Sequence, residues 1–95
     1  MKPPALAVMS AYPNPFNAVT TIEFSLPGAG RAELTVCSVT GQKVRELFSV
    51  VMAAGVYSLI WDGRDDSGRT VSSGVYIARL DSGNHLNTGK LLLMK

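Results

Sequence analysis

Three aspartates in residues 61–76, WDGRDDSGRTVSSGVY, are the side chains whose type and spacing most readily suggest chemistry. Asp62, Asp65 and Asp66 fall within five positions, beside glycines, serines and arginines. Grouped carboxylates can hold a calcium ion, or can serve as the acid and base of a hydrolase. They can also accept hydrogen bonds from the backbone of a turn. These three possibilities point to different classes of protein.

The spacing of the aspartates does not fit an EF-hand loop. Such a loop needs an oxygen ligand at its third position, glycine at its sixth and glutamate at its twelfth. Arg64 occupies the third position, Gly68 comes one residue late, and Ser73 and Gly74 stand where the glutamate belongs. A looser, weak calcium site built from the three aspartates and carbonyl oxygens stays open as an alternative.

A catalytic carboxylate pair is not expected either. Asp65 and Asp66 are sequence neighbours between Arg64 and Arg69, whereas the carboxylates of a glycosidase lie on separate elements across a cleft. We expect no enzyme activity. The stretch is interpreted as a long hairpin connection, in which residues 66–68 make the tight reversal and the aspartates bond to backbone amides.

The remaining candidates for chemistry are isolated. One cysteine, Cys37, and one histidine, His85, cannot form a zinc site alone, and His85 is expected in a solvent-facing loop. Residues 28–33, GAGRAE, begin like a dinucleotide fingerprint, but Glu33 replaces its third glycine and a strand follows. We therefore expect no metal and no cofactor.

Composition indicates a globular chain without affinity for nucleic acid. The 95 residues are 46% hydrophobic and 17% charged, and the net charge of +2 comes from scattered lysines and arginines. No apolar run reaches the roughly 20 residues that a spanning helix needs, and the first 15 residues do not form a signal peptide. The chain is either cytoplasmic or a fragment of something longer.

The elements that position these residues are strands, because apolar side chains recur with a period of two. Only residues 43–52 are ambiguous, since Val44, Leu47 and Val51 would also suit a helix. Dense turn formers separate the runs, in the rhythm of a β-sandwich or barrel. Seven strands are predicted, at about 5–11, 19–26, 31–39, 43–48, 55–62, 74–80 and 86–94.

Inward-facing positions of these strands predict the core. Residues 12–17, YPNPFN, are expected as a rigid segment at a sheet edge, because Pro13 and Pro15 lack amide donors. Tyr12 and Phe16 would be apolar pegs that fasten it to the sandwich. The predicted core comprises Phe16, Ile22, Phe24, Leu26, Leu34, Val36, Tyr57, Leu59, Trp61 and Leu80.

Three runs carry a resemblance to known families: YPNPFNAVTTIEFSLPGAGRAELTVCSVTGQKVREL, GVYSLIWDGRDDSGRTVSSGVYIARL and GKLLLMK. In their order and spacing they resemble the type A C-terminal sorting domain of type IX secretion substrates. They are equally similar to the related Ig-like domain of the flagellar hook-capping family. The resemblance implies an all-β, seven-stranded antiparallel Ig-like β-sandwich. It implies a single domain over residues 1–95, with 1–9 as a possible linker and 10–95 as the sorting domain of a longer secreted protein.

The resemblance also implies a function without catalysis. In the sorting family, the folded domain docks to the outer-membrane translocon, so the cargo is periplasmic in transit and then lies on the cell surface or outside the cell. Recognition would use strand addition to an exposed last strand and positive charge at its end. The implied recognition residues are Gly74, Val75, Tyr76, Lys90, Leu92, Met94 and Lys95.

Two departures and several alternatives accompany this interpretation. The family often has aromatic residues where Cys37 and Ala78 stand here, which thins the core slightly. The alternatives are an accessory spacer or carbohydrate-binding module of a secreted hydrolase, and a hook-capping assembly domain, which would not be expected to end just after its last strand. The partners expected are the secretion machinery and an upstream cargo domain. The domain is expected to be a monomer, with an edge-strand dimer as the alternative.

Overall fold

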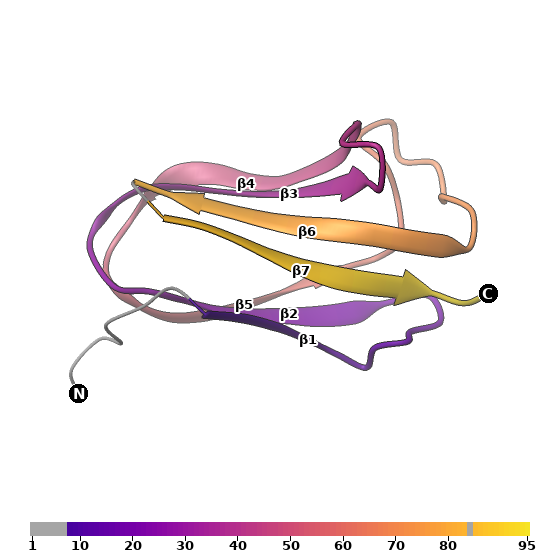
Figure 1. Cartoon of the computed structure of the whole chain (residues 1–95), viewed down its shortest axis with the longest axis horizontal. Helices are drawn as coiled ribbons and strands as arrows, with labels where there is room; N and C mark the ends of the chain where they lie inside the picture. Colours follow the sequence, from indigo (N-terminus) through magenta and orange to yellow (C-terminus); the bar gives the residue numbers. More distant parts are fainter. Residues whose placement is uncertain (1–7, 84) are drawn as a thin grey trace.

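The computed structural model describes residues 8–83 and 85–95, which form two antiparallel sheets packed face to face (Figure 1). This is the predicted seven-stranded, Ig-like β-sandwich. No helix in the described ranges is long and apolar enough to cross a membrane. The three-stranded sheet has the order β1 (Val8–Tyr12), β2 (Thr20–Leu26), β5 (Gly55–Trp61), and the four-stranded sheet has the order β4 (Lys43–Met52), β3 (Gly30–Ser38), β6 (Gly74–Ser82), β7 (His85–Leu93).

The strand boundaries lie close to those predicted, and the largest differences are in β1 and β4. Residues 5–7 of the first predicted strand lie outside the described residues. Val8 and Met9 pair with Ser25 and Phe24, so the sandwich already includes the end of the stretch expected as a linker. β4 is four residues longer than the predicted 43–48, because it keeps pairing with β3 as far as Met52.

Two register irregularities explain why β4 resembled a helix in its spacing. In its pairing with β3, Phe48 is followed by Glu46 and Arg45 by Lys43, which leaves Leu47 and Val44 as extra residues. Each extra residue shifts the alternation of faces by one. Half-buried side chains therefore recur at uneven intervals in β4 instead of at every second position.

The core lies between the two sheets and is continuous from one end to the other. Trp61 is fully buried, with Phe16 at 5.7 Å and Tyr76 at 5.5 Å between ring centroids. Farther along, Phe24 stacks on Tyr57 and on a partly buried ring of β4. The buried members of the predicted core are Phe16, Ile22, Phe24, Leu26, Leu34, Val36, Trp61 and Leu80.

Two predicted core residues, Tyr57 and Leu59, are only half-buried. They pack against the core, but β5 is the outermost strand of its sheet, so a neighbouring strand covers them on one side only. The Tyr57 hydroxyl consequently reaches the carbonyl of Ala53, to which it donates a hydrogen bond of 2.7 Å. Both side chains therefore face the core, as predicted, and are partly covered there.

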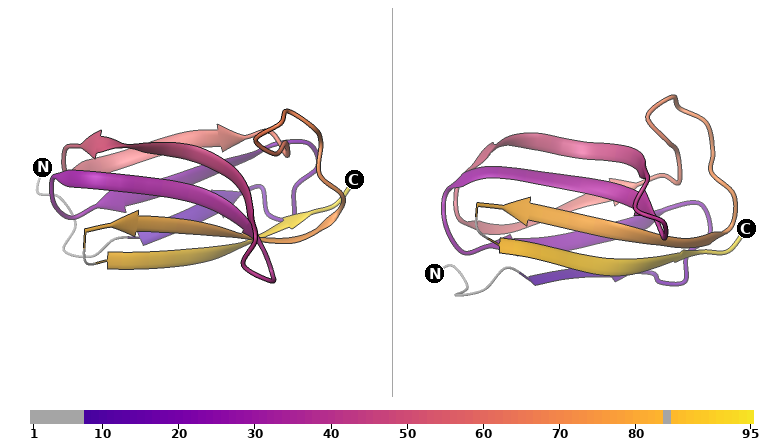
Figure 2. Two further views of the ribbon diagram at one scale, coloured as in Figure 1. Left: turned by 90° about the horizontal axis from the view of Figure 1, so that it is seen from above. Right: turned by 45° about the horizontal axis from the view of Figure 1, so that its top comes forward.

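The connection from β5 to β6 is a crossover between sheets, which corrects the predicted hairpin. β5 belongs to the three-stranded sheet and β6 to the four-stranded sheet, so the two strands are not paired. Figure 2 shows this connection passing over one end of the sandwich. Within it, Gly68 donates to the carbonyl of Asp65, and Arg64 pairs with Thr70, so the tight reversal itself lies where it was predicted.

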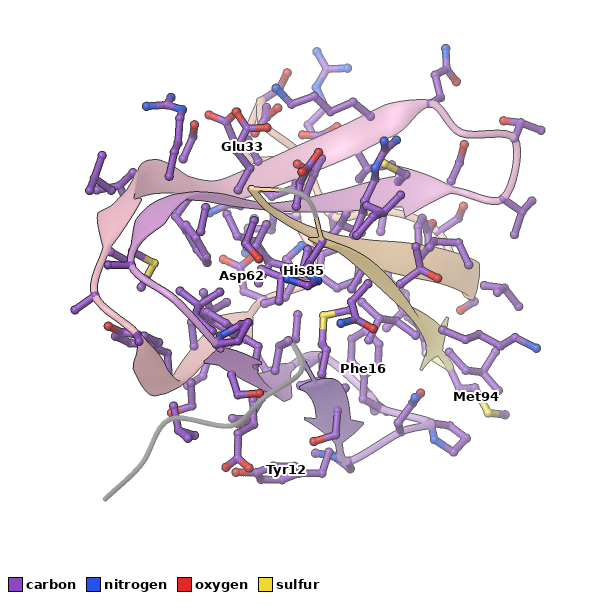
Figure 3. The ribbon with its side chains drawn as sticks, turned by 60° about the vertical axis from the view of Figure 1, so that its left-hand side comes forward. Tyr12, Phe16, Glu33, Asp62, His85 and Met94 are labelled. Atoms are coloured by element: carbon purple, nitrogen blue, oxygen red, sulfur yellow. The ribbon has the colours of Figure 1, made fainter. Side chains whose placement is uncertain are left out.

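The proline segment, residues 12–17, is fastened to the sandwich by Phe16 but not by Tyr12. Phe16 lies between the sheets, whereas the ring of Tyr12 is 52% exposed on the outer face of the three-stranded sheet (Figure 3). Tyr12 is the last residue of β1 and pairs with the outward-facing Thr21, so the period of two turns it to solvent. The predicted role of Tyr12 as an apolar peg was therefore wrong.

Candidate functional site

The candidate site lies where β6 begins and β7 ends, and there several predicted recognition residues share the outer face of the four-stranded sheet. Val75 of β6 pairs directly with Leu92 of β7, and Met94 follows on the same phase of the chain. Met94 is 54% exposed and Val75 37%, and Figure 3 shows Met94 projecting away from the body. We call Val75, Leu92 and Met94 the apolar patch.

Positive charge borders the apolar patch. Lys90 pairs with Ile77 one step along β7, and Lys95 directly follows Met94. Both lysines are exposed, and neither has an ion-pair partner in residues 8–83 and 85–95. The backbone amide of Lys95 donates to the Ser73 hydroxyl at 3.0 Å, which ties the end of the chain to the segment before β6.

Tyr76 does not join this surface, and Gly74 offers it only a backbone. Tyr76 is only 8% exposed; its ring meets Trp61 edge-on and its hydroxyl donates to the carbonyl of Ser72 at 2.6 Å. The alternation along β6 points it inward, so its predicted contact with a receptor was wrong. Gly74 begins β6 with a φ of +155°, next to open space, and presents only its backbone.

The outer edge of β7 is occupied where strand addition was expected. The Asn14 side chain donates to the Lys90 carbonyl at 2.7 Å and accepts from the Leu92 amide at 2.8 Å. The Phe16 amide then donates to the Leu92 carbonyl, and the Met94 amide donates to the Phe16 carbonyl, both at 2.9 Å. β7 is an edge strand, as predicted, but its last residues are not open to another strand.

The three aspartates of the crossover bond to backbone amides. Asp62 accepts from Arg64, and one oxygen of Asp65 accepts from both Ser67 and Arg69. In the described part of the chain, no three histidine, cysteine, aspartate or glutamate side chains are grouped as a metal site would require. The geometry matches the interpretation of these carboxylates as supports of the connection.

Asp66 acts beyond its own loop. Its amide donates to the carbonyl of Val44 and its carboxylate accepts from the amide of Glu46, both at 3.0 Å. It thereby occupies the outer edge of β4 near its start. Sequence reasoning missed this function of Asp66, as it missed that of Asn14, because each depends on a contact far along the chain.

Cys37 and His85 do not meet. Cys37 pairs with Ile77 near the end of β3, and His85 pairs with Ser82 at the opposite end of the four-stranded sheet. His85 is exposed as predicted, although it begins β7 instead of lying in a loop. A pair formed by the thiol and the imidazole is therefore excluded by this arrangement.

Two packed sheets with this strand order define an Ig-like β-sandwich. Residues 16–85 match the FlgD Ig-like domain family, and the chain belongs to that family. No curated protein matches it.

Solved structures from two kinds of protein share the fold. Dimeric latent PorU from Porphyromonas gingivalis superposes with a TM-score of 0.72 at 18% identity, and 92% of this chain covers 9% of PorU. PorZ, a surface component of the type-IX secretion system of P. gingivalis, gives 0.61 at 21%, covering 92% of this chain and 11% of PorZ. FlgD from P. aeruginosa gives 0.64 at 23%, covering 90% of this chain and 68% of that one. The chain thus spans only about a tenth of PorU and PorZ.

Proposed function

We propose that this domain is a non-catalytic sorting module that directs an attached cargo protein across the outer membrane by docking to the type IX translocon. The observation that carries this proposal is the gathering of Val75, Leu92 and Met94 into one apolar patch between Lys90 and Lys95. The cargo passes through the periplasm and then reaches the cell surface or the medium. The fold likeness to PorZ, a surface component of that system, supports a role of this class.

The mode of docking follows from the geometry of the patch. An apolar centre with a charged rim is the usual anatomy of a protein interface, and the centre contributes most of the binding energy. The free ammonium groups of Lys90 and Lys95 favour a partner with acidic groups around an apolar depression. Because Asn14 and Phe16 occupy the edge of β7, the receptor reads the outer face of the sheet and not the backbone edge.

A hook-capping assembly domain is a second candidate. The family match and the coverage of more than 60% of FlgD from P. aeruginosa and from Xanthomonas campestris favour it. The X. campestris protein takes part in the hook capping that is essential for flagellar assembly. In that case the apolar patch contacts a neighbouring subunit. The accessory carbohydrate-binding alternative has less support, because Trp61 and Tyr76 are turned inward.

Point substitutions on the patch test the sorting role better than removal of residues 90–95. Leu91 and Leu93 in that segment are core residues, so a deletion would also unfold the domain. We expect Met94→Asp combined with Val75→Asp to lower export of a cargo fusion by about tenfold or more in a bacterium with a type IX system, because a charge is placed in the desolvated centre of the interface. The measurement is the ratio of extracellular to periplasmic cargo.

The matched control places the same charge on the outer face of the same sheet, but on β4 and at the opposite end from the apolar patch. Val51 is 70% exposed on β4, so Val51→Asp should leave both folding and export unchanged. Normal export of the patch variant, with its folding verified by circular dichroism, would contradict the sorting proposal. Loss of self-association in a cross-linking assay, with export intact, would favour the assembly role.

A further inference from the structure

The outer edge of β7 is covered in part by the side chain of Asn14, whose carboxamide makes the hydrogen bonds that the backbone of a neighbouring strand would make. Four consecutive outward-facing groups are bonded to Asn14 or Phe16: the Lys90 carbonyl, the Leu92 amide, the Leu92 carbonyl and the Met94 amide. The backbone of Phe16 pairs with β7 as a parallel bridge, and the carboxamide of Asn14 continues the ladder by one step. In residues 8–83 and 85–95, no strand or loop backbone pairs with the outward-facing side of β7 at Leu86 and Thr88.

The need for a side chain follows from the prolines. Pro13 and Pro15 have no N–H, so this segment cannot supply ladder donors from its backbone at those positions. A carboxamide carries one donor and one acceptor, as a peptide unit does, and Asn14 uses both. The segment is also held from the other side, because the buried Thr20 hydroxyl donates to the carbonyl of Pro13 at 2.8 Å.

The opposite edge of the same sheet is closed by the same means. On β4, Asp66 supplies an amide donor to Val44 and a carboxylate acceptor to Glu46. The two closures differ in one chemical respect. Asn14 needs both a donor and an acceptor in its side chain, whereas Asp66 needs only the acceptor because its own amide is the donor.

We propose that Asn14 is an edge guard: it keeps β7 from pairing with the β7 strand of a second copy of this chain. An unguarded edge strand is a template for pairing, and natural sheets cover such edges. The occupant of the opened edge is a second copy, because an antiparallel pair centred on Thr88 places Lys90 opposite Leu86 of that copy and so keeps the two Lys90 side chains apart. With the guard in place, the Lys90 carbonyl cannot accept from the Leu86 amide of the second copy, so the pair loses the two hydrogen bonds at its ends.

Asn14→Ala in the full chain tests the proposal by two measurements. Hydrogen exchange of the Leu92 amide should become at least about fivefold faster, while exchange in the buried β3 should stay unchanged. Sedimentation should show a dimer that forms with increasing concentration, up to about 1 mM, where the native chain stays a 10.1 kDa monomer. Asn17→Ala is the control, because the Asn17 side chain makes no hydrogen bond in the described part of the chain.

Conservative variants separate the chemistry from a merely structural effect. Asn14→Asp should behave as Asn14→Ala, because a carboxylate cannot donate to the Lys90 carbonyl, whereas Asp66→Asn should stay monomeric because the acceptor survives. Thr88→Pro added to Asn14→Ala should restore the monomer, since it removes an outward donor of β7. A dimer that persists with Thr88→Pro, an Asn14→Ala chain that stays monomeric, or unchanged exchange at Leu92 would each overturn the proposal.

Discussion

Trp61 is the side chain on which three separate segments meet. Its ring contacts Phe16 from the proline segment and Tyr76 from β6, and its indole N–H donates to the carbonyl of Arg64 at 3.0 Å. One residue thus joins the two sheets to the crossover that connects them. The fully buried ring cannot be replaced by a smaller side chain without leaving a cavity.

Trp61→Ala should lower the free energy of unfolding by about 3–5 kcal/mol, because it removes a large buried side chain and the neighbouring rings cannot fill the space. Trp61→Phe keeps part of the volume but loses the hydrogen bond to Arg64, so we expect a smaller loss. Urea denaturation followed by circular dichroism measures both. A loss below about 1 kcal/mol for Trp61→Ala would mean that the ring is not a core element.

At the residue scale, the period of two predicted which side chains point inward but not how far each is covered. It placed Trp61 correctly, but the full burial of this ring depends on Phe16, Tyr76 and the crossover at Arg64, which cover it although β5 is an edge strand. It placed Tyr76 inward as well, and only the family resemblance suggested a surface role for it. Tyr57 is half-buried because β5 is at the edge of its sheet. The residues of a strand do not show whether that strand will be central or at an edge.

At the scale of elements, the crossover from β5 to β6 depends on two glycines in different surroundings. Gly63 and Gly68 have φ values of +72° and +84°, a conformation that costs an L-residue energy. A Cβ on Gly63 would lie 3.2 Å from the carbonyl oxygen of Ala18, whereas a Cβ on Gly68 would meet nothing within 4 Å. Gly63 thus brings the crossover against the residue that follows the proline segment, and Gly68 only completes a turn.

Gly63→Ala should therefore cost more than Gly68→Ala. We expect about 1 kcal/mol for Gly68→Ala, from the backbone conformation alone, and about 2–3 kcal/mol for Gly63→Ala, where the contact with Ala18 is added. The shift in thermal midpoint of each variant measures the difference. Equal losses would show that the crossover moves freely away from Ala18.

The positions of the strands along the chain were predicted from sequence almost completely, but which strands pair with one another was not. Alternation and turn residues mark where a strand begins and ends, so the connections lie where the turn formers stand. Whether β5 and β6 pair or lie in different sheets depends on contacts between distant residues. The same limit hid the edge closures, although an asparagine between two prolines does carry a local signal, since its side chain is the nearest source of a donor.

At the scale of the whole molecule, one core extends through both sheets, from Trp61 and Phe16 at one end to Leu26 at the other. Neither sheet has an inner face that it can bury alone. Folding of either sheet without the other would expose apolar side chains along its full length. The domain should therefore unfold as a single cooperative unit.

Cooperative unfolding is tested by two probes that report on different regions. The fluorescence of Trp61 follows one end of the core, and far-ultraviolet circular dichroism follows all seven strands. We expect both transitions to coincide in urea, as they do for a two-state domain. Fluorescence that changes before the strands melt would indicate that the crossover and the proline segment detach first.

The direction of β1 has a consequence for anything joined ahead of it. β1 begins in the half of the sandwich away from the C-terminal end of the chain and runs toward that end, and the body measures 38 Å along its longest axis (Figure 1). A large protein attached ahead of β1 would consequently lie toward one end of the sandwich and would leave the apolar patch at the other end uncovered. Under the proposed sorting function, this geometry would let one receptor accept attached proteins of very different size, because none of them would cover the apolar patch.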